Sequence, residues 1–567
     1  MAGVAFYQPG RKNSVNGKEI ERYQIIFEEK IALASEKVMT VSIGEILYYV
    51  FFSLLLLAKG IGLYDGQTFF KLLLVPAVIA WAAKMWLTEY TKKEFVITVL
   101  LLCLGGGIYL ISGEKGALLY IFMITGLKNV PLKRVFAVGG FVWSVSFLGL
   151  TWLNALHLLE GPFKVHEKLG MGMIIRWGLG YSHPNVLHIS YLVFVMFLVY
   201  LLGEKFDLKS AFFFMLGNLV IYIYSVSNTG VIAVTFYLLI SLYWKYKKNL
   251  NIAEKILIQM AMPFCVLFSL LAPVVLQGKL FDIVNDISNT RLNLARHFLS
   301  LSPPTLFGVR LSDIITSQLT MDNSYVFAFV TYGTVLFAVI FLAYFMLVHK
   351  YCRDQKGQEL CAILACLAAG VTEPFMFNTS FKNISLLFMK DILFEEEKKA
   401  EIHMPGYFYR EYVFSLEKPR RIWNAAANRI AGRKKTIIIA VLVGCLVGAL
   451  AYQGLKKEPE RILVPEPSCD IAVLQRTRDS LESAYLSSPA DVPKEADAVI
   501  GYAGGETKMI IYSGGIVKME HIRGLVCSSI TAGMIVAVIF MIKYFYGAER
   551  IARAGQGEVY EKGSDRK

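Results

Sequence analysis

Charge is scarce in this chain: charged residues make up 18% of its 567 residues, whereas 55% are hydrophobic. A soluble domain exposes more polar residues than this, because surface-to-volume scaling always leaves part of the chain outside the core. Apolar runs of about 18 residues or more, long enough to cross a bilayer, recur from Val41 onward. The composition therefore excludes a soluble globular protein and predicts an all-α integral membrane protein.

Motifs of soluble enzymes are missing as well. The chain has no phosphate-binding loop, no HExxH, no GxSxG and no glycine-rich dinucleotide fingerprint. Its eight cysteines form no CxxC pair and no Cys/His cluster with metal-ligand spacing. We therefore expect no cofactor and no metal. Cys469 and Cys527 are the two cysteines expected at the outer side, and whether they pair stays open.

The apolar segments define the expected domain organisation. A polar arm (1–40) without the apolar core of a signal peptide is followed by a polytopic domain (41–394), a cytoplasmic linker (395–435) and a two-span hairpin (436–567) with an outer module (454–525). Spans are expected at about 42–63, 68–87, 95–112, 116–128, 135–158, 186–203, 210–226, 229–244, 256–276, 325–348, 359–376, 381–394, 436–453 and 526–546. The fourth and twelfth are short, as half-helices or re-entrant segments would be.

The distribution of lysine and arginine orients these spans. With the N-terminus in the cytoplasm, basic residues fall in the connections expected on that side, as the positive-inside rule requires. They are Lys84, Lys92, Lys93, Lys128, Lys133, Arg134, Lys205, Lys209, Lys245, Lys247, Lys248, Lys350, Arg353 and Lys356. Both termini are therefore expected in the cytoplasm. The net charge of +14 is explained in this way, and we expect no nucleic-acid partner.

Two long outer connections, about 159–185 and 277–324, depart from this rule because they carry arginines. These are Arg176, Arg291, Arg296 and Arg310. Isolated arginines are tolerated in outer loops, so a purely structural interpretation stays open. The functional interpretation is a phosphate-binding site, because guanidinium groups match phosphate oxygens bidentately. Long loops without helical periodicity are uncommon and are often functional.

Polar motifs cluster at the outer ends of the spans. The segment from Arg176 to Asn185 includes His183-Pro184-Asn185 and leads into a span. A purely structural interpretation, a loop that enters the helix with Asn as its cap, also stays open. A polar turn, Ser225-Val-Ser227-Asn228-Thr-Gly230, joins two further spans. Arg291 to Tyr325 includes Leu-Phe-Gly308 and Asp322-Asn323-Ser-Tyr325, with Gly333 in the following span. Glu373 lies near the outer end of the eleventh span, where an ionisable group is costly and indicates function.

In their order and spacing these motifs resemble the Wzy-type O-antigen and capsule polymerases, whose superfamily also includes the O-antigen ligases. The resemblance covers roughly residues 40–394 and rests on R…GxxHPN, SxSxTG and R…lfG…DNxY. The polymerases usually carry Arg where this chain has Asn228. The ligases tend to carry His where this chain has Asp322, which favours a polymerase.

The resemblance implies a reaction at the outer face of the bacterial cytoplasmic membrane. A growing glycan on undecaprenyl pyrophosphate is transferred to the sugar of an incoming lipid-linked repeat unit, without nucleotide or metal. Arg176 and Arg291 are predicted to hold the pyrophosphate, and Asp322, with His183 as second choice, to accept the hydroxyl proton. Substrate-binding roles are predicted for Asn185, Ser227, Arg296, Arg310, Asn323, Tyr325 and Glu373.

The C-terminal hairpin is architecturally similar to Wzz-like chain-length regulators, with two spans around an outer module. An accessory anchor is an equally good interpretation. The expected partners are the lipid-linked oligosaccharide, the lipid bilayer, and flippase and chain-length regulator proteins. Alternatives for the whole chain are a glycan ligase, a flippase that transports lipid-linked units, and a scaffold for capsule assembly. Against a transporter, the notable charges lie at the outer surface rather than at the midplane.

Overall fold

The computed structural model describes residues 38–159, 161, 163–168, 172–247, 249–288, 290–301, 303–314, 321–394, 411–415, 417–455, 462–465, 499–503, 506–511 and 514–564. Most of the predicted N-terminal arm, part of the linker and much of the outer module, including Cys469, lie outside these residues. The chain divides into two units. One comprises Gly44–Phe408 and Cys445–Thr531, and the other Met1–Ile43, Tyr409–Gly444 and Ala532–Lys567.

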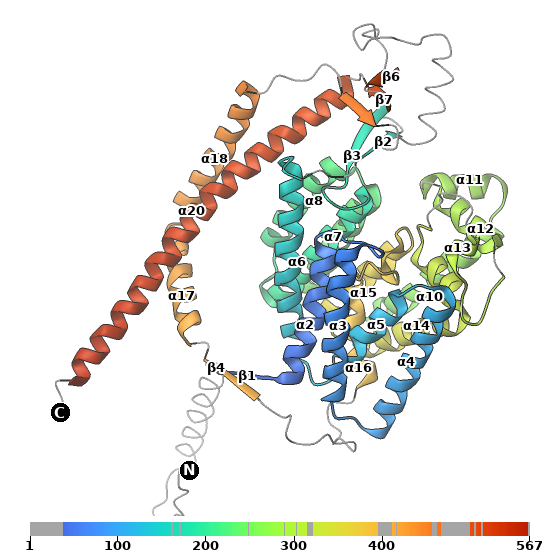
Figure 1. Cartoon of the computed structure of the whole chain (residues 1–567), viewed down its shortest axis with the longest axis horizontal. Coiled ribbons are helices and arrows are strands. Elements are labelled where there is room, and N and C mark those ends of the chain that lie inside the picture. The colour runs from blue at the N-terminus through green and yellow to red at the C-terminus, as the bar shows by residue number, and fades with distance from the viewer. Residues whose placement is uncertain are drawn as a thin grey trace, which may run out of the picture. The chain divides into compact units, whose positions relative to one another are not determined.

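The described residues contain eleven helices long and apolar enough to cross a membrane (Figure 1). They are α2 (Ile43–Gly60), α3 (Thr68–Trp86), α4 (Lys92–Ser112), α6 (Leu132–Ala155), α7 (Pro184–Leu202), α8 (Leu208–Ser225), α9 (Asn228–Lys247), α10 (Ile252–Val275), α14 (Ser324–Arg353), α18 (Lys434–Leu455) and α20 (Gly514–Ser564). The predicted all-α, multi-pass membrane protein is thereby confirmed. Helices of this kind place the chain in contact with the lipid bilayer.

The fourth and twelfth apolar segments are indeed short. Helix α5 (Gly116–Thr125) has ten residues, so it spans about 15 Å, half of a hydrocarbon core of about 30 Å. After α15 (Gly357–Gly370) the chain continues through η2 (Pro374–Met376), η3 (Ile384–Met389) and α16 (Lys390–Leu393). The non-helical backbone there is buried against α5, α14 and α15, as a membrane interior requires.

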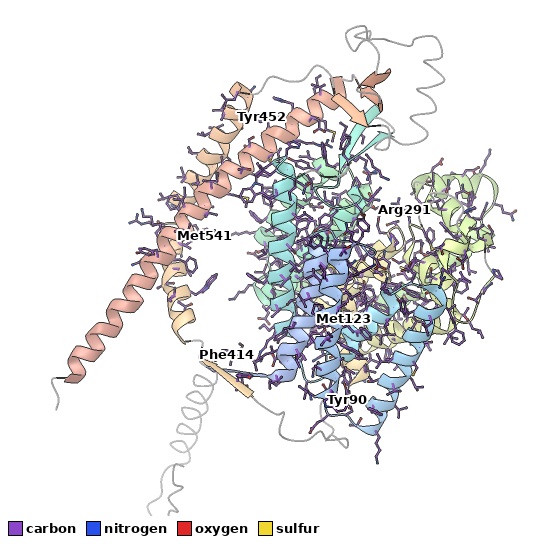
Figure 2. The ribbon with its side chains drawn as sticks, in the orientation of Figure 1. Tyr90, Met123, Arg291, Phe414, Tyr452 and Met541 are labelled. Carbon is purple, nitrogen blue, oxygen red and sulfur yellow. The ribbon has the colours of Figure 1, made fainter. Side chains whose placement is uncertain are left out.

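Helix α7 lies at the centre of the bundle, where it contacts α6, α8, α9 and α15. Buried side chains fill the space between the helices, and the labelled Met123 and Arg291 lie among them (Figure 2). His188 of α7 is fully buried. Its Nδ1 lies 2.9 Å from Ser225 Oγ and its Nε2 lies 2.7 Å from Asn218 Oδ1, so its ring ties α7 to α8. A Cβ on Gly230 would lie 2.3 Å from the His188 ring, so α9 begins tightly against it.

The two long connections contain regular structure, contrary to our expectation of loops without helical periodicity. The first holds the antiparallel hairpin of β2 (Phe163–Lys168) and β3 (Gly172–Trp177), in which Phe163 pairs with Trp177. The second holds α11 (Gly278–Ile287), α12 (Arg291–Leu301) and α13 (Leu311–Ile314). In α11 the exposed Leu280, Ile283 and Ile287 lie on one stripe. Such a short amphipathic helix is missed when only full spans are sought.

A kink in α14 joins the second long connection to the bundle. Gly333 interrupts the helix with φ of 77°. The loop before α13 packs into this break, so that a Cβ on Gly308 would lie 1.9 Å from the Thr331 carbonyl oxygen. The Thr334 amide, freed from the helix, donates to the Thr305 carbonyl at 2.8 Å. The loop therefore replaces a hydrogen bond that the kink breaks.

The remaining elements belong to the N- and C-terminal parts of the chain. Strand β1 (Val38–Ser42) pairs antiparallel with β4 (Glu411–Ser415), and α17 (Glu417–Gly432) follows. Residues 38–40, expected in the polar arm, and 411–415, expected in the linker, are thus paired strands. In the outer module β5 (Ile462–Pro465), β7 (Glu506–Ile511) and β6 (Val499–Ala503) form a sheet in that order. The hairpin helices touch where Ser529 Oγ donates to the Cys445 carbonyl at 2.7 Å.

Candidate functional site

The first helix end that contributes to the site is the start of α7. His183 is its N-cap, and its ring accepts a hydrogen bond from the Asn185 amide at 3.2 Å. Pro184 occupies the first helical position, where its missing N–H costs nothing. This arrangement leaves the Asn185 side chain available for contacts with other elements.

The second contribution is the turn between α8 and α9. Val226 adopts a left-handed conformation with φ of 43°, which a β-branched residue rarely does. Ser227 Oγ then accepts a hydrogen bond from the Gly230 amide at 3.3 Å in the first turn of α9. The N-terminus of this 20-residue helix carries Asn228 and Thr229, both of which line a cavity. The positive end of the helix dipole therefore lies beside that cavity.

The third contribution is Arg291, the first residue of α12. It follows Thr290, another β-branched residue in the left-handed region, with φ of 65°. The guanidinium is buried and donates from Nε to the Thr372 carbonyl at 2.7 Å. Since the backbone conformation at Thr290 is costly, the surrounding contacts must hold the start of α12 in place.

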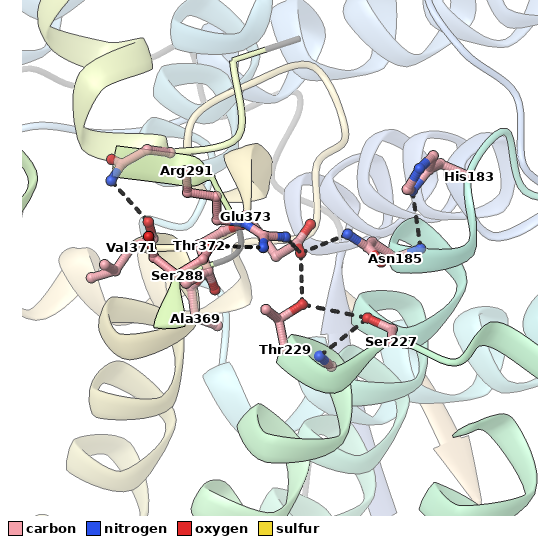
Figure 3. Close-up of polar contacts among 12 residues, drawn as sticks. His183, Asn185, Ser227, Thr229, Ser288, Arg291, Ala369, Val371, Thr372 and Glu373 are labelled. Atoms are coloured by element: carbon pink, nitrogen blue, oxygen red, sulfur yellow. Dashed lines mark hydrogen bonds and ion pairs between the residues drawn. The ribbon is translucent and has the colours of Figure 1, made fainter. Parts of the chain in front are cut away.

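Glu373, in the loop after α15, joins these elements. Its Oε1 accepts hydrogen bonds from Asn185 Nδ2 at 3.0 Å, Thr229 Oγ1 at 2.8 Å and Arg291 NH2 at 3.0 Å. Figure 3 shows the carboxylate between Arg291 on one side and Asn185 and Thr229 on the other. Four segments that are far apart in the sequence thus meet at one oxygen atom.

Arg176, at the end of β3, extends this network. Its NH2 donates to Asn185 Oδ1 at 2.7 Å, and its Nε donates to the Ser225 carbonyl at 3.0 Å. A continuous chain of contacts therefore runs from Arg176 through Asn185 and Glu373 to Arg291. The two arginines predicted to act together are brought to one site.

Arg176 and Arg291 both line a cavity of about 560 Å³, which we call the arginine cavity. Its polar wall includes Asn185, Asn228, Thr229, Asp286 and Ser288. Its apolar wall includes Ile232, Ala233, Phe236, Ala368 and Ala369. Ile232 is 65% exposed and Phe236 36% exposed, on the face of a membrane-spanning helix. The apolar wall of the cavity therefore continues onto the surface that faces lipid.

Burial and charge act in opposite directions on the ionisable groups. Burial raises the pKa of Glu373 to about 7, and the neighbouring Asp322 raises it further, whereas Arg291 lowers it. Burial lowers the pKa of Arg176, while Glu373 raises it. An arginine stays charged at any working pH, so both guanidinium groups remain cations. Glu373, in contrast, exchanges a proton near neutral pH.

Residues at the start of α14 lie next to Glu373 and help to fix its position. Asn323 Oδ1 accepts hydrogen bonds from the Tyr325 and Val326 amides, and Ser324 Oγ donates to the Glu373 carbonyl at 2.6 Å. Asp322 is half-buried and close enough to act on the Glu373 pKa. Tyr325 points into the bundle, where its hydroxyl donates to the Leu367 carbonyl at 2.8 Å. Asn323 and Tyr325 thus position the site, and neither lines the cavity.

Two predicted arginines lie away from this cavity. Arg296 donates to the carbonyls of Pro273 and Leu276, each at 2.6 Å, and therefore caps the C-terminus of α10. The Arg310 side chain is exposed, and its Nε would lie 3.5 Å from a Cβ on Gly113. Neither residue is among those that line the cavity.

Sequence reasoning did not single out Thr229, His188 or Asp286. Thr229 belongs to the SxSxTG turn that the sequence indicated, but no role was predicted for it. His188 follows His183 by five residues, but no sequence pattern indicates that it packs against the turn. Asp286 lies on α11, which was not predicted. Recognising α11 as an amphipathic helix would have placed Asp286 near its end, five residues before Arg291.

No protein-family model, curated protein or solved structure matches this chain. The proposal that follows is therefore supported by the geometry of the site and by the sequence motifs that meet there.

Proposed function

We propose that this chain polymerises undecaprenyl-pyrophosphate-linked oligosaccharide repeat units into a surface polysaccharide. The observation that carries the proposal is the cavity in which two guanidinium groups face an apolar wall open to lipid. Such a cavity fits an amphipathic ligand with an anionic head and a hydrocarbon tail. A lipid pyrophosphate has this chemistry, and its head would lie between Arg176, Arg291 and the start of α9.

The reaction is a glycosyl transfer between two lipid-linked molecules. A hydroxyl oxygen of the acceptor sugar forms a bond to the anomeric carbon of the donor glycan, and the bond from that carbon to the pyrophosphate breaks. The bonding electrons leave with the undecaprenyl pyrophosphate, whose growing charge the two arginines stabilise. Their shared contacts with Asn185 and Glu373 hold them in place before the reaction begins.

The acceptor hydroxyl must lose a proton during this transfer. Glu373 lies directly behind the cavity wall, where it accepts hydrogen bonds from the lining residues Asn185, Thr229 and Arg291, and its pKa of about 7 suits it to take up that proton. This assignment adds Glu373 to Asp322 and His183, the residues predicted from the sequence. Asp322 then acts through its charge on Glu373, and His183 acts as the N-cap that presents Asn185.

The orientation follows from the same proposal. The end of the bundle that carries the site would face the outside of a bacterial cytoplasmic membrane, with both termini in the cytoplasm. The basic residues of the connections at the opposite end agree with this orientation. No nucleotide is required, because the pyrophosphate leaving group already activates the donor.

The test is the lipid-linked glycan profile of cells that lack this protein, rescued with wild type, Arg291→Ala or Arg310→Ala. We expect single repeat units to accumulate on the outer leaflet, and to be cleared by wild type and Arg310→Ala. Arg291→Ala should lower polymerisation by about 10²–10³-fold, the usual cost of a lost oxyanion donor. Arg310→Ala is the matched control, because it also removes one positive charge from the connection 277–324, but from an exposed residue that does not line the cavity.

Other outcomes identify the alternatives. Full-length polymer that remains on its lipid would indicate a ligase, and repeat units retained on the inner leaflet would indicate a flippase. If Arg291→Ala reduces the amount of protein in the membrane, Arg176→Lys is the second variant, because it keeps the charge and loses the planar fork. Full activity in both variants would contradict the proposal.

A further inference from the structure

A second cavity, of about 310 Å³, lies between the C-terminal hairpin and the bundle, within the larger unit. Its lining includes Asn154, His157, Trp177, Tyr452, Glu520 and His521. Small-molecule sites occupy about 300–1,000 Å³, so this cavity is at the lower end of that range. It is separate from the arginine cavity, with which it shares no lining residue.

Three polar side chains in the lining of the second cavity contact one another. Trp177 Nε1 donates to Glu520 Oε1 at 3.1 Å, and Glu520 also forms an ion pair with Arg523. Arg523 is only 2% exposed, and its other donors bind backbone carbonyls, including that of Ile175 at 2.7 Å. The Arg523 side chain therefore holds the hairpin against the bundle.

Asn154 of α6 contributes to the lining of this cavity. Asn154 is 5% exposed, and its Oδ1 makes no hydrogen bond within the described part of the chain. This oxygen is covered by protein atoms and does not face the cavity, because a Cβ on Gly161 would lie 2.3 Å from it.

The lining combines aromatic rings with neutral, acidic and basic polar groups, and this combination matches a carbohydrate. A sugar ring presents apolar C–H faces, which pack on aromatic side chains such as Trp177 and Tyr452, and hydroxyls that donate and accept hydrogen bonds. A phosphate group is favoured less here than in the arginine cavity, because the one guanidinium in this lining, that of Arg523, is paired with the Glu520 carboxylate of the same lining, whereas two guanidinium groups line the other cavity. The chemistry of the lining therefore favours a glycan over an anion.

We propose that the second cavity is a glycan-binding subsite, which holds the growing polysaccharide outside the arginine cavity. This inference rests on the proposed function, because the glycan is its product. Trp177 directly follows Arg176 in β3, and successive side chains of a strand point to opposite faces. Arg176 and Trp177 therefore point to opposite faces of one strand, and each lines one of the two cavities. Occupancy of the subsite would influence how long the polymer stays bound.

The test measures binding of polysaccharide, freed from its lipid by mild acid, to the full-length protein in nanodiscs. Tyr452→Ala and His521→Ala change the hairpin side of this cavity, and neither residue lines the arginine cavity. We expect each to weaken binding at least tenfold and to shift the modal length of the polymer made in cells. The initial rate at which single repeat units are consumed should stay within twofold of wild type.

The matched control is Trp152→Phe. Trp152 Nε1 donates to Thr531 Oγ1 at 3.1 Å, so this variant removes a contact between hairpin and bundle without changing the lining. Unchanged binding in Tyr452→Ala and His521→Ala, or an equal loss in Trp152→Phe, would overturn the inference. The proposed function is tested separately, because it fails only if Arg291→Ala still makes polymer.

Discussion

Arg291 and Glu373 form an ion pair of 3.0 Å between two side chains that are only 9% and 6% exposed. Taking two charges out of water is costly, so a buried pair is weak evidence for stability by itself. Here the pair joins the start of α12 to the loop after α15, and the same carboxylate oxygen accepts from Asn185 and Thr229. The pair therefore sets the geometry of the arginine cavity.

Removing one member of this pair should cost more than removing both. Arg291→Met leaves the Glu373 carboxyl buried without its cation, and we expect a loss of about 3 kcal/mol in unfolding free energy. This is the lower end of the usual range, because the carboxyl can take up a proton at neutral pH. Arg291→Met combined with Glu373→Gln should recover most of that stability and no activity. The measurement is thermal unfolding in detergent together with polymer synthesis.

The control for this cycle is the exposed pair of Arg353 and Asp354, 3.0 Å apart. Exposed pairs contribute about 0–1 kcal/mol, so Arg353→Met should change the unfolding temperature little. If Arg291→Met were as stable as wild type, the pair would not organise the site as we describe.

The pH dependence of the protein should reflect Glu373. Its pKa of about 7 in the folded protein is raised above the ordinary value of 4.5 by burial. Between these values the folded state binds more protons than the unfolded state. The contribution of Glu373 to stability is therefore complete below about 4.5 and is lost as the pH rises through about 7. Activity should rise over the upper part of that window, because proton acceptance needs the ionised carboxylate.

Two variants check this assignment. Glu373→Gln should remove the pH dependence of stability between these values. Asp322→Asn should shift the midpoint of the activity profile to lower pH, because the Asp322 charge raises the Glu373 pKa. A profile that keeps its midpoint in Asp322→Asn, or one that persists in Glu373→Gln, would assign the proton to another group.

The spans could be predicted from the sequence because the length needed to cross a bilayer is a local property. The predicted segment at 68–87, for example, corresponds to α3, Thr68–Trp86. The long connections could not be predicted in this way, because β2, β3 and α11 are short and their apolar residues give no long run. Individual motifs were visible, since Asn185 and Glu373 stand near span ends and Arg176 and Arg291 are arginines in outer connections, where basic residues are sparse.

Their mutual contacts were not visible in the sequence. Asn185 and Glu373 are separated by 188 positions, and only the packing of α7, α9 and α15 brings them together. The roles of Arg296 and Arg291 could not be separated either. Both are arginines of α12, five positions apart, yet one caps α10 and the other binds Glu373.

The close contact between Gly308 and the kink of α14 predicts a strong effect of a single methyl group. In Gly308→Ala the new Cβ would lie 1.9 Å from the Thr331 carbonyl oxygen, at a φ of 82°. Neither backbone segment can yield easily, so we expect a loss of well over 2 kcal/mol, measured by thermal unfolding. Gly278→Ala is the matched control, because its φ is 56° and nothing lies within 4 Å. Gly278→Ala should lower the free energy of unfolding by only about 1–2 kcal/mol, which is the cost of the left-handed backbone conformation alone. Equal losses in the two variants would show that the kink is not held by this contact.

Arg523 should act as a positioning residue for Arg176. Its NH2 donates to the Ile175 carbonyl at 2.7 Å, and its Nε donates to the Ile223 carbonyl at 2.9 Å. These carbonyls belong to β3 and α8, the two elements that also position Arg176 and its acceptor, the Ser225 carbonyl. Arg523→Lys keeps the charge but cannot reach both carbonyls with a rigid fork. A displacement of about 1 Å at a reacting group costs on the order of 10²-fold, so we expect kcat to fall at least tenfold.

The split between kcat and KM distinguishes positioning from loss of structure. Arg523 does not line the arginine cavity, so KM for the lipid-linked repeat unit should stay within about twofold of wild type. Simple unfolding would instead lower the amount of active protein and leave the kcat of the remaining molecules unchanged. Titration of active sites with a slowly reacting lipid-linked donor measures that amount. If kcat per active site in Arg523→Lys equals that of wild type, the hairpin anchors the bundle without influencing the reaction. If it falls while KM holds, the hairpin takes part in setting the position of Arg176.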